Sequence, residues 1–143
     1  QYKDLDQPLQ PFAEPESAAP LAQTEIEPGH NSWTVRYDAM TNTTVLERIN
    51  SDGWHRIAGI DLELGGHTEY RYTIKSDDPL SARLETHYVR RYRRGGWGVT
   101  LVTDIALSST ATDFLLNARI EAREGEEAVK TETWSLTIPR DHV

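Results

Sequence analysis

The sequence predicts an all-β fold, in which an antiparallel meander forms one strongly curved or barrel-like sheet, with a β-sandwich as the alternative, preceded by an extended N-terminal arm. Three observations lead to this prediction. Apolar and polar residues alternate with a period of two from Trp33 to Ile138, which is typical of half-buried strands. Prolines are concentrated in the first 32 residues, where no period is sustained. A Gly-Gly step at 95–96 is a hairpin signal.

The first 32 residues hold five of the chain's seven prolines, and six acidic residues against a single lysine. Repeated proline interrupts the hydrogen bonding of both helices and sheets, so residues 1–32 are predicted to be an arm or linker and residues 33–143 the β domain. Two interpretations of this arm are open. It is either a disordered tail or a segment that lies along a partner surface through Leu9, Phe12 and Leu21.

At least seven strands are expected in the β domain. The first four of them are predicted at 33–37, around 45–49, at 60–64 and at 70–74. In the first, third and fourth of these segments, apolar residues recur at every second position. The connections predicted between them are turns in "AMTNT" (39–43) and "NSDGW" (50–54), and a break at Gly65-Gly66.

The stretch "YVRRYRRGGWGV" (88–99) places four arginines and three aromatic residues around the Gly-Gly step. A two-residue turn at Gly95-Gly96, with positive φ at both glycines, makes residues whose numbers sum to 191 face each other. One face of the hairpin is then apolar apart from Arg90, and the other is mostly polar. A slip of one residue would exchange the two faces. The four arginines are therefore predicted to divide between both faces, which argues against a nucleic-acid site.

The last two strands follow from the same apolar face. Residues 114–130 have a composition that favours helix, but their apolar residues keep a period of two and predict a strand, with Ile105 opposite Leu116. A two-residue turn at Glu124-Gly125 would turn Thr131 and Thr133 inward, whereas a three-residue turn or a bulge would turn Glu132 and its alternate neighbours inward. The apolar residues favour the second case, and Glu132 is then a possible partner for Arg90. Those apolar residues are Trp134, Leu136 and Ile138.

Composition limits the classes of partner. The chain has 143 residues, a net charge of −8 and no cysteine, which predicts one domain with neither disulfides nor thiolate metal sites. The negative charge disfavours nucleic acids and anionic membranes, and no apolar run approaches the length of a membrane span. We expect a soluble protein and favour the cytoplasm, although the lack of cysteine leaves the compartment open. Because the chain opens with Gln1 and its only methionine is Met40, it is expected to be a processed or excised piece.

No group of residues in the sequence predicts a reaction. Nucleophile-elbow, phosphate-loop and zinc-helix motifs are missing, and the five histidines lack metal-ligand spacing, so no catalytic residue, metal or cofactor is expected. His87 opposite Asp104 resembles a general base with its orienting carboxylate, but without a predicted nucleophile an ion pair across two strands is the better interpretation. The "SDDP" at 76–79 is interpreted as a turn and not as a calcium loop.

Four residues on the predicted apolar face are weak candidates for ligand binding or packing. They are Tyr88, Arg90, Tyr92 and Trp97. Tyr70 and Tyr72 share the same predicted face, and together these aromatic residues could line a cavity for a sugar or lipid. Packing in the core of a curved sheet is the favoured interpretation. Arg90 would need a carboxylate, carbonyl groups or a ligand, because an unpaired buried guanidinium is costly.

Three stretches together carry a family resemblance. "QPLQPFAEPESAAPL" (7–21), "TIKSDDPLSAR" (73–83) and the closing "WSLTIPRDHV" (134–143) resemble the last part of serine hydrolases related to X-prolyl dipeptidyl peptidase and cocaine esterase. The resemblance covers nearly the whole chain and implies a terminal antiparallel β region, reached through a proline-rich connection from a jelly-roll domain. It also implies that the catalytic Ser, Asp and His lie in an upstream α/β-hydrolase domain, so no catalytic residue carries over.

The resulting functional hypothesis is a non-catalytic accessory domain for packing, stability or assembly. Its expected partners are the upstream hydrolase domains of the same parent or of another subunit, with no nucleic acid and no membrane. The alternative is a β-barrel-like module that encloses a small apolar molecule and meets its anionic end with Arg90. An independent enzyme that uses His87 ranks third.

Overall fold

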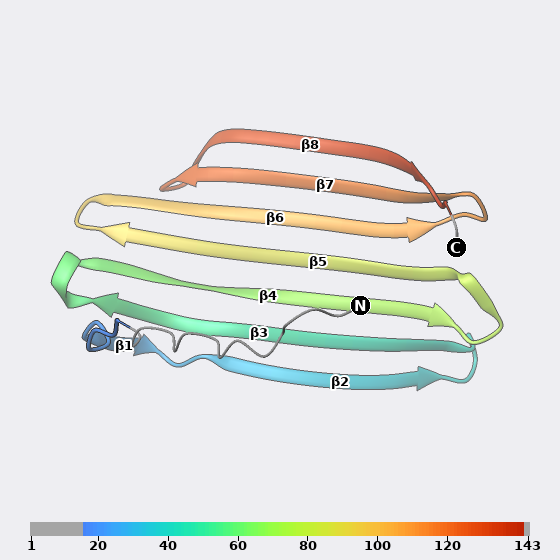
Figure 1. The fold of residues 1–143 in the computed structure, drawn as a ribbon, viewed down its shortest axis with the longest axis horizontal. Helices are drawn as coiled ribbons and strands as arrows, with labels where there is room; N and C mark the ends of the chain where they lie inside the picture. The colour runs from blue at the N-terminus through green and yellow to red at the C-terminus, as the bar shows by residue number, and fades with distance from the viewer. Residues whose placement is uncertain (1–15, 142–143) are drawn as a thin grey trace, which may run out of the picture.

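The structure, a computed structural model, describes residues 16–141, which form one sheet of eight strands (Figure 1). All neighbouring strands that pair are antiparallel, and the order in the sheet is β1-β3-β4-β5-β6-β7-β8, with β2 beside β1 along the same edge of β3. The only helical element in this part of the chain is the 3-10 turn η1. The elements are β1 (Gln23–Glu27), β2 (His30–Asp38), β3 (Thr43–Ile57), η1 (Ala58–Ile60), β4 (Leu62–Lys75), β5 (Asp78–Arg94), β6 (Trp97–Ser109), β7 (Asp113–Glu124) and β8 (Glu127–Pro139).

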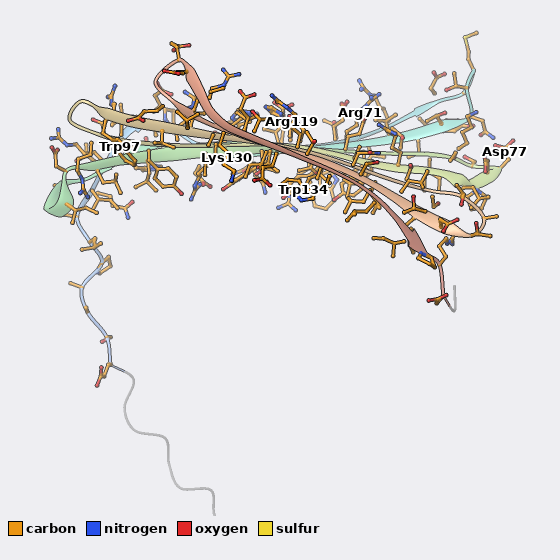
Figure 2. All side chains as sticks on the ribbon, turned by 90° about the horizontal axis from the view of Figure 1, so that it is seen from above. Arg71, Asp77, Trp97, Arg119, Lys130 and Trp134 are labelled. Carbon is orange, nitrogen blue, oxygen red and sulfur yellow. The ribbon has the colours of Figure 1, made fainter. Side chains whose placement is uncertain are left out.

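The prediction of an all-β antiparallel meander is confirmed. The sheet is open, because β1 and β2 lie at one edge and β8 lies at the other. Seen edge-on, residues 16–141 form a single twisted layer with side chains on both sides, and no second layer of these residues covers either face (Figure 2). A sandwich stays a prediction, since the second sheet would have to come from outside residues 16–141.

The hairpin between β5 and β6 has the predicted register. Arg94 pairs with Trp97, and every further pair up to Arg83 with Ser108 sums to 191. Of the two glycines in this turn, only Gly95 has positive φ, at 55°, so the prediction that both need it was wrong. Positive φ at the first central residue alone fits a type II′ turn, which requires glycine only there.

The register between β6 and β7 differs from the prediction by two residues. Ile105 faces Ala118, and Leu116 faces Leu107. The loop closes through hydrogen bonds between Thr110 and Asp113, so the centre of the turn lies one residue later than the predicted register requires. A shift of two keeps every side chain on its predicted face, because alternation in a strand has a period of two.

The last hairpin confirms the favoured alternative. Its turn is at residues 125–126, and a bulge at Val129 shifts the register, so that Ala122 pairs with Lys130 while Arg123 pairs with Ala128. The bulge puts Glu132 and its alternate neighbours on the apolar face, as expected.

Two predicted interruptions of the early strands were wrong. "NSDGW" is not a turn, because β3 continues through a bulge at Asp52 with Gly53 at φ 74°. Gly65 and Gly66 do not break β4, which runs from Leu62 to Lys75. A Cβ on Gly66 would lie 2.2 Å from the Val89 carbonyl oxygen, and one on Gly65 would lie 2.0 Å from the Gly53 carbonyl oxygen. These glycines therefore permit close backbone approach around the bulge.

Part of the predicted arm is a strand. Residues 23–27 pair with the end of β3, from Gln23 opposite Ile57 to Glu27 opposite Trp54. Residues 16–22 form neither helix nor strand, and Leu21 is exposed. Leu9 and Phe12 lie outside the described residues.

The sheet has almost no interior of its own. Among the described residues, Val89 is the one buried apolar side chain, at 8% exposure, and Glu121 is the one buried charged side chain, at 5%. The chain exposes 11290 Å², whereas a compact globular protein of its mass exposes about 7,500 Å². A single layer contributes to this excess because neither of its faces is covered.

Replacing Gly95 by alanine should destabilise the fold more than the same change at Gly96. Open space surrounds both positions, so they differ in φ alone. We expect Gly95→Ala to lower the free energy of unfolding by about 1 kcal/mol more than Gly96→Ala, measured by urea denaturation at one protein concentration. Equal losses for the two variants would contradict the assigned turn.

Candidate functional site

The two faces of the sheet differ sharply in composition. The strand register defines one face, which we call the apolar face. It holds the even-numbered residues of β4, β5, β7 and β8 and the odd-numbered residues of β2 and β6. It also holds the even-numbered residues of β3 that precede the bulge. The intervening residues form the polar face. Figure 2 shows Arg71 and Arg119 on one side of the layer and Trp134 on the other.

One half of the apolar face carries a continuous apolar surface, which we call the apolar band. It consists of three neighbouring rows of side chains that cross the sheet from β2 to β8. The central row is wholly apolar and comprises Val35, Leu46, Tyr72, Leu84, Leu107, Leu116 and Leu136. On one side lies the row of Trp33, Arg48, Tyr70, Thr86, Ile105, Ala118 and Trp134. On the other side lie Tyr37, Thr44 and Ile74 toward one edge, and Ser109, Phe114 and Ile138 toward the other.

The apolar band is exposed to solvent. At the β2 edge Trp33 is 66% exposed and Val35 is 63% exposed, and at the β8 edge Trp134 is 44% and Leu136 is 47% exposed. From the usual strand and residue spacings, the band spans about 34 Å by about 20 Å, or about 700 Å². The largest apolar patch of a typical soluble monomer is about 300–600 Å², so this surface is larger than a lone domain normally leaves uncovered.

A groove of about 420 Å³ runs over the middle of the band. Leu46 and Tyr72 form one wall, and Leu107 and Phe114 form the other, with Leu84 between them. Its lining is almost wholly apolar, which suits an apolar occupant.

The four candidates from the sequence lie together on the apolar face, outside the band. Tyr88, Arg90 and Tyr92 alternate along β5, and Trp97 lies at the start of β6, opposite Arg94. Tyr70 and Tyr72 share this face, with their ring centroids 6.4 Å apart. The predicted common face is therefore confirmed, but none of the four candidates lines the groove.

Arg90 has a different partner from the one expected. Its guanidinium donates to the carboxylate of Asp52, the bulge residue of β3, and this hydrogen bond is the main cause that raises the pKa of Arg90. Glu132 instead pairs with Lys130, with Nζ and Oε1 2.8 Å apart, so the predicted Arg90–Glu132 contact was wrong. Asp52 was missed because only the bulge turns it toward β5.

Arg48 is the one charged residue in the apolar band. Its guanidinium lies 5.6 Å from the ring centroid of Trp33 and 6.0 Å from that of Tyr70, and its Nε donates to Asn50 at 3.1 Å. It has no ion pair within residues 16–141. Its charge is held by two aromatic faces, an arrangement that the sequence alone does not predict because the rings come from neighbouring strands.

The polar face carries a network of ion pairs. Glu47 lies 2.8 Å from Arg36 and 3.6 Å from Arg71, and Arg71 lies 3.7 Å from Glu85. A broad groove of about 880 Å³ is lined in part by Glu47, Arg71 and Glu85. The arginines of the basic stretch also divide as predicted, since Arg93 pairs with Glu63 on this face while Arg90 lies on the other. Because the charges largely compensate one another, this face is suited to water.

His87 and Asp104 form the predicted pair across β5 and β6. Nδ1 of His87 lies 2.6 Å from Oδ1 of Asp104, and both side chains are about half exposed. Across the described part of the chain, no serine or threonine hydroxyl is hydrogen-bonded to His87, and no cluster of His, Asp and Glu could hold a metal ion. This pair therefore lacks the nucleophile that a hydrolytic triad needs.

Glu121 is the most deeply buried charged residue in the part of the chain that the structure describes. Arg119 and Arg123 both donate to its carboxylate, and the hydrogen bond from Arg123 is the largest cause of a lowered pKa for Glu121. Burial opposes this effect, and the hydrogen bond from Arg119 adds to it. The three side chains form a cluster of ion pairs along the polar face of β7.

Arg140, in the closing I-P-R-D motif, has a structural role that the sequence did not reveal. Its guanidinium lies 5.2 Å from the ring centroid of Phe114, and its Nη1 donates to the Thr110 carbonyl oxygen at 3.0 Å. Its backbone N–H donates to Thr112. Arg140 thus fastens the end of β8 to the loop between β6 and β7.

No family model, curated protein or solved structure matches the chain. Within residues 16–141 there is also no helix with the length and apolar character required to cross a membrane. The candidate functional site is therefore defined by geometry alone, and it is the apolar band.

Replacing Glu121 by glutamine should destabilise the fold in a pH-dependent manner. Because the folded-state pKa of Glu121 is below its usual value of 4.5, its stabilising contribution is present above that pH and is lost as the pH falls through the folded-state pKa. We expect Glu121→Gln to lower the melting temperature at neutral pH and to approach the unmodified chain in acid. Glu126→Gln, in the exposed turn before β8, is the control and should change little. A constant difference at all pH values would contradict this role for the carboxylate.

Proposed function

We propose that the chain is a non-catalytic accessory β domain that serves packing, stability or assembly of a serine hydrolase resembling X-prolyl dipeptidyl peptidase and cocaine esterase. The observation that carries the packing role is the exposed apolar band. The link to a hydrolase rests on the sequence resemblance.

The energetics of a single layer support a packing role. Ordering each residue costs about 1–2 kcal/mol of backbone entropy, and burial of apolar surface is the main compensation. Residues 16–141 bury one apolar side chain and leave the rows of the band in water. A protein surface that covers the band would supply the missing burial, and so we expect this face to be covered in the working protein.

The polar face supports the non-catalytic part of the proposal. The His87–Asp104 pair has an orientation that a general base could use, but the neighbouring side chains of its row are Glu69 and Arg119. Neither is a nucleophile for acyl transfer in the manner of a serine hydrolase. Catalysis is therefore assigned to other domains of the parent protein.

The ligand-binding alternative draws on one observation, the apolar groove over Leu84 and Leu107. In this alternative Arg90 binds the anionic end of the ligand, but Arg90 does not line the groove and is paired with Asp52. An apolar molecule in the groove would leave the edges of the band exposed, at Trp33 and Trp134, so the packing role accounts for more of the surface.

We expect the chain to be inactive on acyl esters and on X-Pro amides, with rates equal to those of buffer, and His87→Gln to behave as the unmodified chain does. The measurement is product release monitored by absorbance over a range of protein concentrations. Turnover that scales with concentration and disappears in His87→Gln would overturn the non-catalytic assignment.

The association with a hydrolase has its own test. The reading frame upstream of this chain should be continuous and encode a G-x-S-x-G nucleophile elbow. A frame that encodes a different enzyme class would remove the hydrolase from the proposal and leave the packing role to be judged on the apolar band.

A further inference from the structure

We infer that the apolar band is covered by the same band of a second copy of this chain, so that two single-layer sheets form a two-layer sandwich. The inference rests on the proposed packing role and names the partner. It requires self-complementarity of the band in size, shape and charge, and each of these can be read from the strand register.

The size of the band is sufficient. Two copies of a surface of about 700 Å² would bury about 1,400 Å², within the range of about 1,200–2,000 Å² for stable interfaces between proteins. Sheets in a sandwich pack about 10 Å apart, with their strands within about 30° of each other, and they bury alternate side chains as the band presents them.

The rows fit each other about a two-fold axis that runs parallel to the strands and over β5. Such an axis lays each row of one copy on the same row of the other, with β2 over β8, β3 over β7 and β4 over β6. The central apolar row then meets only apolar side chains. In the next row Trp33 of each copy lies over Trp134 of the other, and the small side chains of Thr86 meet at the axis.

The charges also fit this arrangement. Arg48 is the charged group of the band without an ion pair in residues 16–141, and it lies on β3. The axis brings β8 of the second copy over β2 and β7 over β3, which puts Glu132 of that copy one row and one strand away from Arg48. Within residues 16–141, the ion pair of Glu132 is with Lys130 on the same exposed strand, so its carboxylate can turn to a second cation. An isologous interface forms this contact twice.

The contact ends where the band ends. Beyond the row of Glu132 lies the row of Arg90, and β5 over β5 would bring the two copies of Arg90 together. Asp52 of the same chain neutralises each of them. The interface is therefore expected to cover the half of the sheet that includes the β6–β7 loop and not the half with the Gly95-Gly96 turn.

The test is the oligomeric state of the full chain, measured by sedimentation equilibrium. Val35→Glu and Leu136→Glu place a charge in the proposed interface at positions that are exposed within one copy. We expect each variant to raise the dimer dissociation constant by about 10- to 100-fold, because a buried unpaired charge is costly. The matched controls Thr34→Glu and Thr137→Glu put the same charge at the neighbouring residues on the polar face and should leave it unchanged.

A charge exchange keeps the test decisive if the first variants fail to fold. Arg48→Glu should weaken the dimer, Glu132→Arg should weaken it less, and the double exchange should restore a dissociation constant near that of the unmodified chain. The melting temperature should also rise with protein concentration, because two copies then fold as one unit. A monomeric unmodified chain, equal effects of Val35→Glu and Thr34→Glu, or no rescue in the double exchange would overturn the inference.

The outcomes separate this inference from the proposed function. A monomeric chain whose binding to the upstream hydrolase domains is abolished by Val35→Glu would refute the second copy and leave the packing role intact. A dimer encoded without any hydrolase upstream would refute the accessory role and leave the sandwich intact.

Discussion

The structure depends on one constraint, namely that a single β layer cannot remove its apolar side chains from water. The backbone ladders satisfy the N–H and C=O groups of eight strands, but successive side chains point to opposite faces, and each face needs its own cover. The polar face meets this need with water and compensating charges. The apolar face has seven strands of aligned aliphatic and aromatic residues and nothing above them in the described part of the chain. This imbalance is the reason we propose the apolar face as the functional surface.

Bulges adjust the layer without disturbing the division of its faces. The extra residue at Asp52 lets β3 continue past the point where Gly65 approaches its backbone, and it supplies the carboxylate that neutralises Arg90. The bulge at Val129 returns the side chains of β8 to the phase that completes the apolar rows. Without these bulges, β3 or β8 would place polar residues among the apolar rows, because a shift of one residue exchanges the two faces of a strand.

Charged groups on the apolar face are held in ways that leave its central row clear. Arg90 is neutralised within the chain, whereas Arg48 rests on the rings of Trp33 and Tyr70. A guanidinium on aromatic rings keeps its charge and its donors available to a further carboxylate. A packing surface that presents both an apolar row and an available cation favours specific binding, because a partner must supply both apolar side chains and a carboxylate in matching positions.

The sequence by itself determined the strand character, the register of the hairpin at Gly95-Gly96 and the separation of the faces, because these follow from alternation and local turn chemistry. It did not reveal that β3 passes through "NSDGW", that β4 passes through Gly65-Gly66, or that Asp52 meets Arg90, because a bulge is stabilised by neighbouring strands that are distant in sequence. The predicted barrel-like closure of the sheet also depends on whether its edge strands meet, and no local sequence pattern encodes this. Only the tertiary structure decided that β2 and β8 stay apart, and so left the apolar side chains facing outward as a surface instead of inward as a core.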